Sequence, residues 1–241
     1  MFQYGRTVVA KSGLKNYIQP VYRSVVPLLM RDRLARECVN PYSELENANQ
    51  VIFVHIPKNA GNGVAKSLFD MTPKGHNYLS QYRSADPQKY VDYFRFAFSR
   101  NIWSRFYSAY AYLKKGGFGV YDQEFSRKYL ERYASFTDFV HAMEDDVLAS
   151  KIMSWTHFIP QSRFILIDGR NELDFLGSVE DMSASISYIR ERLGLPQRDV
   201  SRVNASDSRD YRYEYDARSV DIVGRLYADD AELLGYTFHP E

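Results

Sequence analysis

Short apolar runs along the chain alternate with longer stretches in which hydrophobic positions recur every three or four residues. Each short run is rich in β-branched or aromatic residues and is bounded by turn or charge signals, which predicts a buried strand. The predicted strands cover residues 51–55, 94–99 and 164–168. The period of the longer stretches predicts helices over residues 62–70, 102–114, 135–152, 181–193 and 217–234.

Strands that alternate with helices require crossover connections, because parallel neighbours cannot be joined by tight turns. The predicted fold class is therefore α/β, with a mostly parallel central sheet flanked by helices. In such sheets, ligands bind beyond the carboxyl ends of the strands. Residues 1–50 are predicted to form an N-terminal arm or peripheral helices ahead of one domain at 51–241. The three glycines within 115–133 predict a mobile loop.

Composition adds three constraints. The 31 Lys and Arg residues balance 30 Asp and Glu residues, so no overall field favours nucleic acid or an anionic membrane as a partner. Cys38 is the single cysteine, so no disulfide can form within the chain. No apolar run approaches the ~20 residues of a membrane span, and the N-terminus lacks the pattern of a signal peptide. We therefore expect a soluble, cytoplasmic protein that holds any anionic ligand through local geometry.

The stretch VIFVHIPKNAGNGVAKSLF, at residues 51–69, contains the first candidate site. Pro57 ends the strand because it lacks an N–H group. Gly61 and Gly63 permit positive φ and let a ligand approach the backbone closely. The helix that follows brings its first N–H groups to the same point. With Lys58 beside it, this turn predicts a site for an anion.

Two other interpretations of this stretch stay open. The first is a nucleoside triphosphate P-loop, G-x-x-x-x-G-K-[ST], because Lys66 and Ser67 stand in the right order, but Ala60 and Ala65 occupy both glycine positions. Asp168, after an apolar run, would then hold Mg²⁺, and the protein would be a kinase or NTPase that uses ATP. The second is an ordinary strand-to-helix turn that binds no ligand.

The sequence FRFAFSRNIWSRFYSAY, at residues 94–110, predicts a second cationic element at the same edge of the sheet. Arg100 follows the strand directly, and Asn101 can cap the helix after it. Ser104 and Ser108 are four residues apart, on one face of that helix. Arg100 and Ser108 are able to hold a phosphate together, the guanidinium through two parallel hydrogen bonds and the hydroxyl as a donor. The simpler interpretation pairs Arg100 with a carboxylate.

Taken together, the two elements resemble the donor-binding motifs of the carbohydrate sulfotransferases. HIPKNAGNGV at 55–64 is similar to the family's 5′-phosphosulfate loop, and RNIWSRFYSAY at 100–110 is similar to its 3′-phosphate motif. THFIPQSRFILID, DFLGSVEDM, VNASDSRDYRYEYD and LYADDAELLGYTF follow in the family's order, so the resemblance covers about residues 51–238. The family includes the heparan sulfate 2-O-, chondroitin and HNK-1 sulfotransferases. The resemblance implies a P-loop-like three-layer fold and a soluble, bacterial-type member.

The resemblance also implies the sulfuryl donor, 3′-phosphoadenosine 5′-phosphosulfate (PAPS), used without a metal. Lys58 is expected to stabilise the bridging oxygen that departs with the phosphate. Arg100 and Ser108 are expected to hold the 3′-phosphate, with Arg209 as a further contact over the nucleotide. The backbone amides expected to hold the 5′-phosphate belong to Asn59, Ala60, Gly61, Asn62, Gly63 and Val64.

An acceptor hydroxyl needs a base, and histidine suits that role near neutral pH. His76 is placed like the base of heparan sulfate 2-O-sulfotransferase and is the first candidate. His157 precedes FIPQ and is predicted to bind the acceptor or to act as the base itself. Asp70 and Asp86 remain alternatives, because some sulfotransferases use a carboxylate. The implied acceptor is a carbohydrate or polysaccharide, and an inactive module that binds nucleotide or glycan is the non-enzymatic alternative.

Overall fold

The computed structural model describes residues 27–37, 40–197 and 210–238. Its centre is a sheet of three parallel strands in the order β1-β2-β5. These strands are β1 (Val51–Val54), β2 (Phe94–Ser99) and β5 (Phe175–Ser178). A separate antiparallel pair consists of β3 (Leu166–Ile167) and β4 (Arg170–Asn171). The predicted α/β class, with a parallel central sheet flanked by helices, is confirmed.

Helices account for most of the remaining described residues. In chain order they are α2 (Leu28–Glu37), α3 (Glu44–Asn49), α4 (Gly61–Phe69), α5 (Leu79–Ala85), α6 (Pro87–Asp92), α7 (Ile102–Lys114), α8 (Val120–Tyr129), α9 (Phe136–Ala142), α10 (Asp146–Met153), α11 (Ser162–Ile165), α12 (Met182–Arg192), the 3-10 helix η1 (Tyr211–Glu214), α13 (Ala217–Leu226) and α14 (Ala228–Leu234).

Alternate residues of the strands face two different apolar layers. Ile52 and Val54 pack with buried residues of α5, α6 and α11 on one face of the sheet. Val51 and Phe53 pack with α3, α4 and α12 on the other face. This alternation is the period of a strand. Because helices cover both faces, every residue of β1 is buried, which explains the unbroken apolar run in the sequence.

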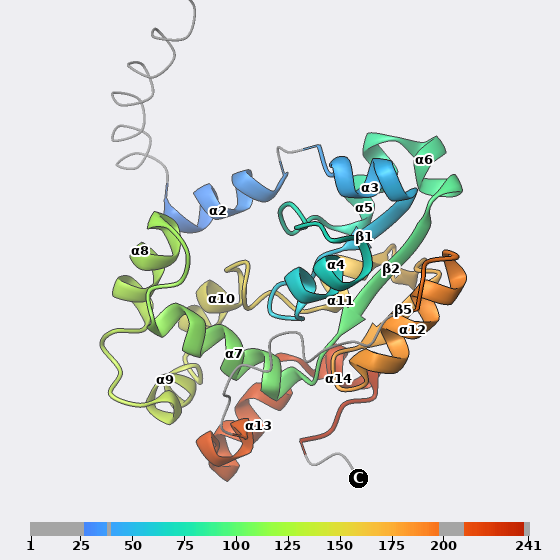
Figure 1. Ribbon diagram of the computed structural model, residues 1–241. Helices are drawn as coiled ribbons and strands as arrows, with labels where there is room; N and C mark the ends of the chain where they lie inside the picture. The colour runs from blue at the N-terminus through green and yellow to red at the C-terminus, as the bar shows by residue number, and fades with distance from the viewer. Residues whose placement is uncertain (1–26, 38–39, 198–209, 239–241) are drawn as a thin grey trace, which may run out of the picture.

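A further apolar cluster is built from helices alone. Phe106, Phe125, Phe139 and Trp155 are buried where α7, α8, α9, α10 and α13 pack together. In Figure 1, α8 and α9 lie on the left, away from the strands of the central sheet. Helix α7 begins at the carboxyl end of β2 and continues into this cluster, so it connects the sheet edge to the helical part of the molecule.

The predicted strand at 164–168 is wrong. The carboxylate of Asp230 accepts hydrogen bonds from the backbone N–H groups of Gln161 and Ser162, at 2.6 and 2.8 Å, and this begins the short helix α11. Only the two residues of β3 are extended, and they pair with β4 outside the central sheet. The third central strand is β5, whose run is interrupted by Gly177. A Cβ at Gly177 would lie 2.9 Å from the Cβ of Ser185, so α12 can pack closely there only against glycine.

Other predicted elements are divided differently in the structure. Residues 115–133 are not one loop, because α8 occupies half of them, and only the turn before it uses glycines at positive φ. The predicted helix at 135–152 is two helices, since Asp145 caps the start of α10 through the N–H of Leu148. The predicted helix at 217–234 is interrupted at Tyr227. At Asp145, a polar cap inside an apolar period therefore begins a new helix where the period alone would have continued the first.

The N-terminal described residues pack onto the rest of the chain. Leu45 of α3 is buried beside the residues of β1, and Arg31 of α2 forms two hydrogen bonds with the carboxylate of Glu124 on α8, at 2.6 and 3.0 Å. Residues 1–26 lie outside the described part, so the boundary at residue 50 stays a prediction. Across the described residues, every helix is too short or too polar to cross a bilayer.

Candidate functional site

The loops that leave β1 and β2 are in contact. Nη1 of Arg100 donates a hydrogen bond to the backbone carbonyl of Lys58 over 3.0 Å. Nε of the same guanidinium donates to Oγ of Ser104, also over 3.0 Å. Parallel neighbours present their carboxyl ends at the same edge of a sheet, which places the residues that follow them together. The guanidinium of Arg100 therefore lies against the backbone of the loop that carries Lys58.

The side chain of Gln161 links these two loops through hydrogen bonds. Its side chain is fully buried. Oε1 accepts hydrogen bonds from Nδ2 of Asn59, at 2.6 Å, and from the backbone N of Arg100, at 3.0 Å. Nε2 donates to the carbonyl of Arg100 over 2.8 Å. A buried amide bonded to both loops fixes the distance between them. The side chain of Asn59 is part of this link and donates also to the carbonyl of Phe98.

The turn after β1 brings free backbone N–H groups to the same point. Lys58 and Ala60 adopt left-handed conformations, with φ of 69° and 56°, at a cost on the order of 1 kcal/mol or more each. Helix α4 then begins at Gly61, and Ala60 offers no side chain to cap it. The N–H groups of Gly61, Asn62 and Gly63 consequently lack partners within the helix and are available to an anion.

Two details expected of this turn are wrong. The amides of Asn59 and Val64 are already used, because they donate to the carbonyls of Ile56 at 3.3 Å and of Ala60 at 3.0 Å. Gly61 does not adopt positive φ. It is required for space instead, because a Cβ there would lie 2.0 Å from Cδ2 of His55 and 2.3 Å from its Nε2. The glycine accommodates the imidazole ring.

The ammonium group of Lys58 lies over an aromatic ring. Nζ is 3.9 Å from the centroid of Tyr112, which is a cation–π contact. Burial, with the Arg100 guanidinium nearby, lowers the pKa of Lys58 to about 8. The side chain is thus a partly desolvated cation near neutral pH. Such a group stabilises developing negative charge more strongly than a fully hydrated ammonium does.

Two histidines next to this loop share one hydrogen-bond pattern. Nδ1 of His76 lies 2.9 Å from the carbonyl of His55, and Nδ1 of His55 lies 3.1 Å from the carbonyl of Gly75. A carbonyl oxygen only accepts, so each Nδ1 carries the proton and each Nε2 has a lone pair. Burial lowers the pKa of His55 to about 4. Burial and the neighbouring His55 hold the pKa of His76 well below its usual range. Both rings are neutral at neutral pH.

His157 has a carboxylate partner. Its Nε2 lies 3.3 Å from Oδ1 of Asp122. Oδ2 of Asp122 accepts hydrogen bonds from the hydroxyl of Tyr112, at 2.8 Å, and from the backbone N of Phe118, at 2.9 Å. Burial alone would raise the pKa of Asp122, but His157 and these two donors together lower it. The ring of His157 lies 6.1 Å from that of His76. The fold therefore gathers Lys58, His76 and His157, and adds Asp122 and Tyr112.

Two residues expected to bind the nucleotide are not among those that the structure shows in this cluster, one of them because it lies outside the described residues. Ser108 is half-buried on α7, one turn beyond the Ser104 that contacts Arg100. Arg209 lies outside the described residues. Ser104 belongs to the same motif, and its place one turn from the start of the helix signalled that it could reach Arg100. No comparable signal in the sequence pointed to Asp122.

Residues of the other interpretations lie apart from the cluster. Lys66 is exposed in the middle of α4 and forms an ion pair with Asp70. Asp168 is exposed and pairs with Arg83 at 3.2 Å. Asp86 caps α6 through the N–H of Lys89. Within the described residues, no group of three or more His, Cys, Asp or Glu side chains is arranged to hold a metal ion.

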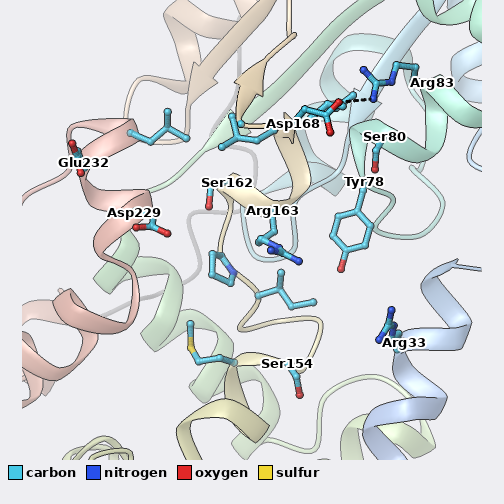
Figure 2. A pocket seen from close by; sticks show the side chains of 17 residues that line it. Arg33, Tyr78, Ser80, Arg83, Ser154, Ser162, Arg163, Asp168, Asp229 and Glu232 are labelled. Carbon is cyan, nitrogen blue, oxygen red and sulfur yellow. Dashed lines mark hydrogen bonds and ion pairs between the residues drawn. The ribbon is translucent and has the colours of Figure 1, made fainter. Parts of the chain in front are cut away.

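A cavity of about 1430 Å³ is lined by none of the cationic or histidine side chains of the cluster. Tyr78, Ile159 and Pro160 line it, two or three residues along the chain from His76 and His157, but neither histidine does. Figure 2 shows the side chains around this space, with the ion pair between Arg83 and Asp168 at its edge. We place the candidate site at the strand ends, because convergent cations and free amides define an anion site and volume alone does not.

Comparison with known proteins adds one finding. A model described as "Sulfotransferase family" matches residues 45–237. This span includes all strands of the central sheet and the whole cluster around Lys58. None of the curated proteins and none of the solved structures compared with the chain matches it.

Proposed function

The chain belongs to the sulfotransferase family, and we propose that it transfers the sulfuryl group of PAPS to a hydroxyl group of a carbohydrate or polysaccharide. One observation carries this proposal: the guanidinium of Arg100 touches the carbonyl of Lys58. A nucleotide with anionic groups at both its 3′ and 5′ positions can reach both cations at once. The motifs at 55–64 and 100–110 resemble sites for a 5′-phosphosulfate and a 3′-phosphate. They favour PAPS over ATP because ATP has no 3′-phosphate.

The chemistry of the residues fits the two ends of this donor. The free N–H groups of Gly61, Asn62 and Gly63 and the ammonium of Lys58 suit the 5′-phosphosulfate. The guanidinium of Arg100 and the hydroxyl of Ser104 suit the 3′-phosphate, with Ser108 and Arg209 as further contacts. PAPS supplies a sulfuryl group joined to a phosphate that can leave.

The residues of the chain would divide the remaining work of the transfer. His76 takes the proton of the acceptor hydroxyl on Nε2, the nitrogen left unprotonated by the contact with the carbonyl of His55. The acceptor oxygen forms its bond to sulfur while the bond from sulfur to the phosphate oxygen breaks, and that oxygen keeps the electron pair. Lys58 neutralises the charge that develops there. Cations and amides of the chain supply the positive field, so the proposal requires no metal.

Binding preferences distinguish this proposal from a kinase. In the triphosphate P-loop, the lysine and the Mg²⁺-binding carboxylate face the phosphates, whereas Lys66 and Asp168 are exposed and paired elsewhere. We expect 3′,5′-adenosine bisphosphate to raise the melting temperature markedly more than ATP with Mg²⁺. The reverse order would support a kinase and contradict the proposal.

Activity then requires a direct measurement. Labelled PAPS incubated with the protein and a panel of polysaccharides is expected to label at least one of them. A protein that binds the bisphosphate but labels no acceptor in a broad panel would be a binding module without activity.

A further inference from the structure

The turn between α7 and α8 is built around one carboxylate. Asp122 is 7 % exposed, and its two oxygens meet three donors, on Tyr112, Phe118 and His157. Gly117 adopts φ of 59°, and a Cβ there would lie 2.4 Å from the Cβ of Asp122. The turn can therefore close over the carboxylate only with glycine at this position. This contact fixes the position of the Asp122 carboxylate, and with it the orientation of its three partners.

The carboxylate determines the tautomer of His157. An ionised carboxylate only accepts hydrogen bonds, so Nε2 of His157 carries the proton that points to Oδ1 of Asp122. Nδ1 of a neutral ring is then an acceptor. Among the described residues, this buried Nδ1 has no hydrogen-bond partner. A buried polar atom without a partner costs about 1–3 kcal/mol, and native proteins usually have a reason to keep one.

His76 carries the opposite tautomer. Its Nδ1 is protonated toward the carbonyl of His55, so its Nε2 is the acceptor. The two ring centroids are 6.1 Å apart. In its neutral form each of the two imidazoles receives a hydrogen bond, His76 through Nε2 and His157 through Nδ1. Hydrogen bonds of ~2.8 Å from two neighbouring hydroxyl groups of one small ring would satisfy both.

We propose that Asp122 is a positioning residue that fixes His157 as a hydrogen-bond acceptor beside His76, so that the pair recognises an acceptor with two neighbouring hydroxyl groups. One hydroxyl loses its proton to Nε2 of His76 as its oxygen bonds to sulfur. The other donates to Nδ1 of His157 and remains unreacted. This arrangement selects a vicinal diol, the common unit of sugar rings, over an isolated alcohol or a phenol. The reaction rests on the function proposed above, whereas the two tautomers do not.

Nitrogen NMR of the imidazole rings tests the tautomers without any ligand. The ring nitrogens of ¹⁵N-histidine-labelled protein are assigned through single His→Gln variants near neutral pH. We expect His76 to be protonated at Nδ1 and His157 at Nε2. The charged and titratable groups around His157 are Asp122 of α8, Tyr112 of α7 and the two histidines near β1. A wild-type His157 that is protonated at Nδ1, or at both nitrogens, would overturn the proposal.

Asp122→Asn sharpens the test, because it should invert the tautomer of His157. Oδ2 of Asp122 receives two donors, so the oxygen of the new amide stays there and its NH₂ group faces His157. Nε2 of His157 must then accept, and the proton moves to Nδ1, as exchanging a carboxylate for an amide does in other enzymes. His76 should not change. Asp92→Asn, on an exposed carboxylate of α6, is the matched control. An unchanged His157 tautomer in a folded Asp122→Asn protein would contradict the positioning role.

Two small probes test the recognition of a diol. With 3′,5′-adenosine bisphosphate bound, cis-cyclohexane-1,2-diol and cyclohexanol are titrated while the ring nitrogens are followed. We expect the diol to shift both His76 Nε2 and His157 Nδ1 and to bind up to about tenfold more tightly, the effect of one added hydrogen bond. Asp122→Asn should remove that advantage. Equal binding of the probes, or no binding of the diol, would refute paired recognition. Failure of the bisphosphate to bind would instead refute the proposed donor.

Discussion

The proposed donor side of the site, around Lys58 and Arg100, and the proposed acceptor side, around His157 and Asp122, are held in place by different kinds of contact. Lys58 and Arg100 stand on loops that follow neighbouring strands, and backbone groups and the buried amide of Gln161 hold those loops together. Tyr112 lies on α7 and His157 lies in the turn between α10 and α11, and the two meet at a single side chain, Asp122. The donor side is therefore part of the sheet edge, whereas the acceptor side depends on contacts between side chains.

This difference predicts how the two sides respond to change. Substitutions that touch the backbone links of the donor side should reduce stability and activity together. Substitutions on the acceptor side should alter activity while the fold persists, because few backbone groups lose partners there. Proteins with a rigid donor site and an adaptable acceptor site can keep one reaction while the acceptor changes.

The largest effect should follow from removing the ammonium group of the donor side. Lys58→Met keeps an unbranched side chain, one atom shorter, but loses its charge, and we expect the rate of sulfuryl transfer to fall about 10²–10³-fold. Lys66→Met, on the exposed face of α4, is the control and should leave the rate unchanged. Single-turnover transfer from labelled PAPS measures both. Full activity of Lys58→Met would mean that another residue stabilises the charge on the leaving group.

The second-largest effect should come from removing the hydrogen bonds of the buried Gln161 side chain. Gln161→Leu leaves the backbone N and carbonyl of Arg100 without their partner, at a cost of about 3 kcal/mol in the free energy of unfolding. Binding of 3′,5′-adenosine bisphosphate should weaken in the same variant, because Arg100 loses its fixed position. Urea unfolding and calorimetry measure the two effects. Gln88→Leu, at an exposed site on α6, provides the comparison. Unchanged stability of Gln161→Leu would mean that the loops hold themselves together.

Gly61→Ala should disturb both sides at once. The added methyl group overlaps the ring of His55, and relieving such overpacking typically costs about 1–3 kcal/mol. Movement of His55 also moves the carbonyl that holds Nδ1 of His76, so kcat should fall. Gly224→Ala in α13 is a control of opposite sign. Its Cβ meets Trp103 at 3.4 Å, and alanine favours a helix interior by ~0.5–1 kcal/mol. Equal stabilities of the two variants would show that His55 moves freely.

The smallest effect expected is a one-sided dependence on pH. Lys58 is charged below its pKa of about 8 and neutral above it, so transfer should fall up to about tenfold per pH unit above pH 8. The pKa of His76 is well below its usual range, so the base stays unprotonated and no loss is expected from pH 7 to pH 6. Lys58→Arg should move the alkaline limit upward, at a reduced rate. A rate that stays constant through pH 9 would exclude Lys58 as the titrating group.

Sequence patterns predicted the contact between the loops of Lys58 and Arg100 because its geometry is local. Residues that follow two parallel strands must share an edge of the sheet, and the bounds of β2 and α7 agree with those predicted from hydrophobic period and capping. The prediction of a strand at 164–168 failed because a short apolar run fits a buried helical turn as well as a strand. The long-range bond to Asp230, which no local pattern reveals, decides between them.

The acceptor side was only partly predictable for a related reason. His76 and His157 were predicted as site residues from residue type and resemblance, and their roles stay predictions. The role of Asp122 depends on the fold, because its partner His157 lies 35 residues further along the chain. The glycines before α8 suggested mobility, but the structure uses one of them to close the turn over Asp122. Glycine content alone does not distinguish a flexible segment from a tightly packed one.

Tyr112 belongs to both sides of the site. The face of its ring supports the ammonium of Lys58, while its hydroxyl bonds to the carboxylate that orients His157. With the roles proposed above for Lys58 and His157, a substitution of Tyr112 would change acceptor choice and departure of the leaving group together. Substitutions of Phe118, which is 90 % exposed and projects from the adjoining turn, could change acceptor specificity without this coupling. New acceptors would then be gained at the rim, while the inherited reaction centre stays intact.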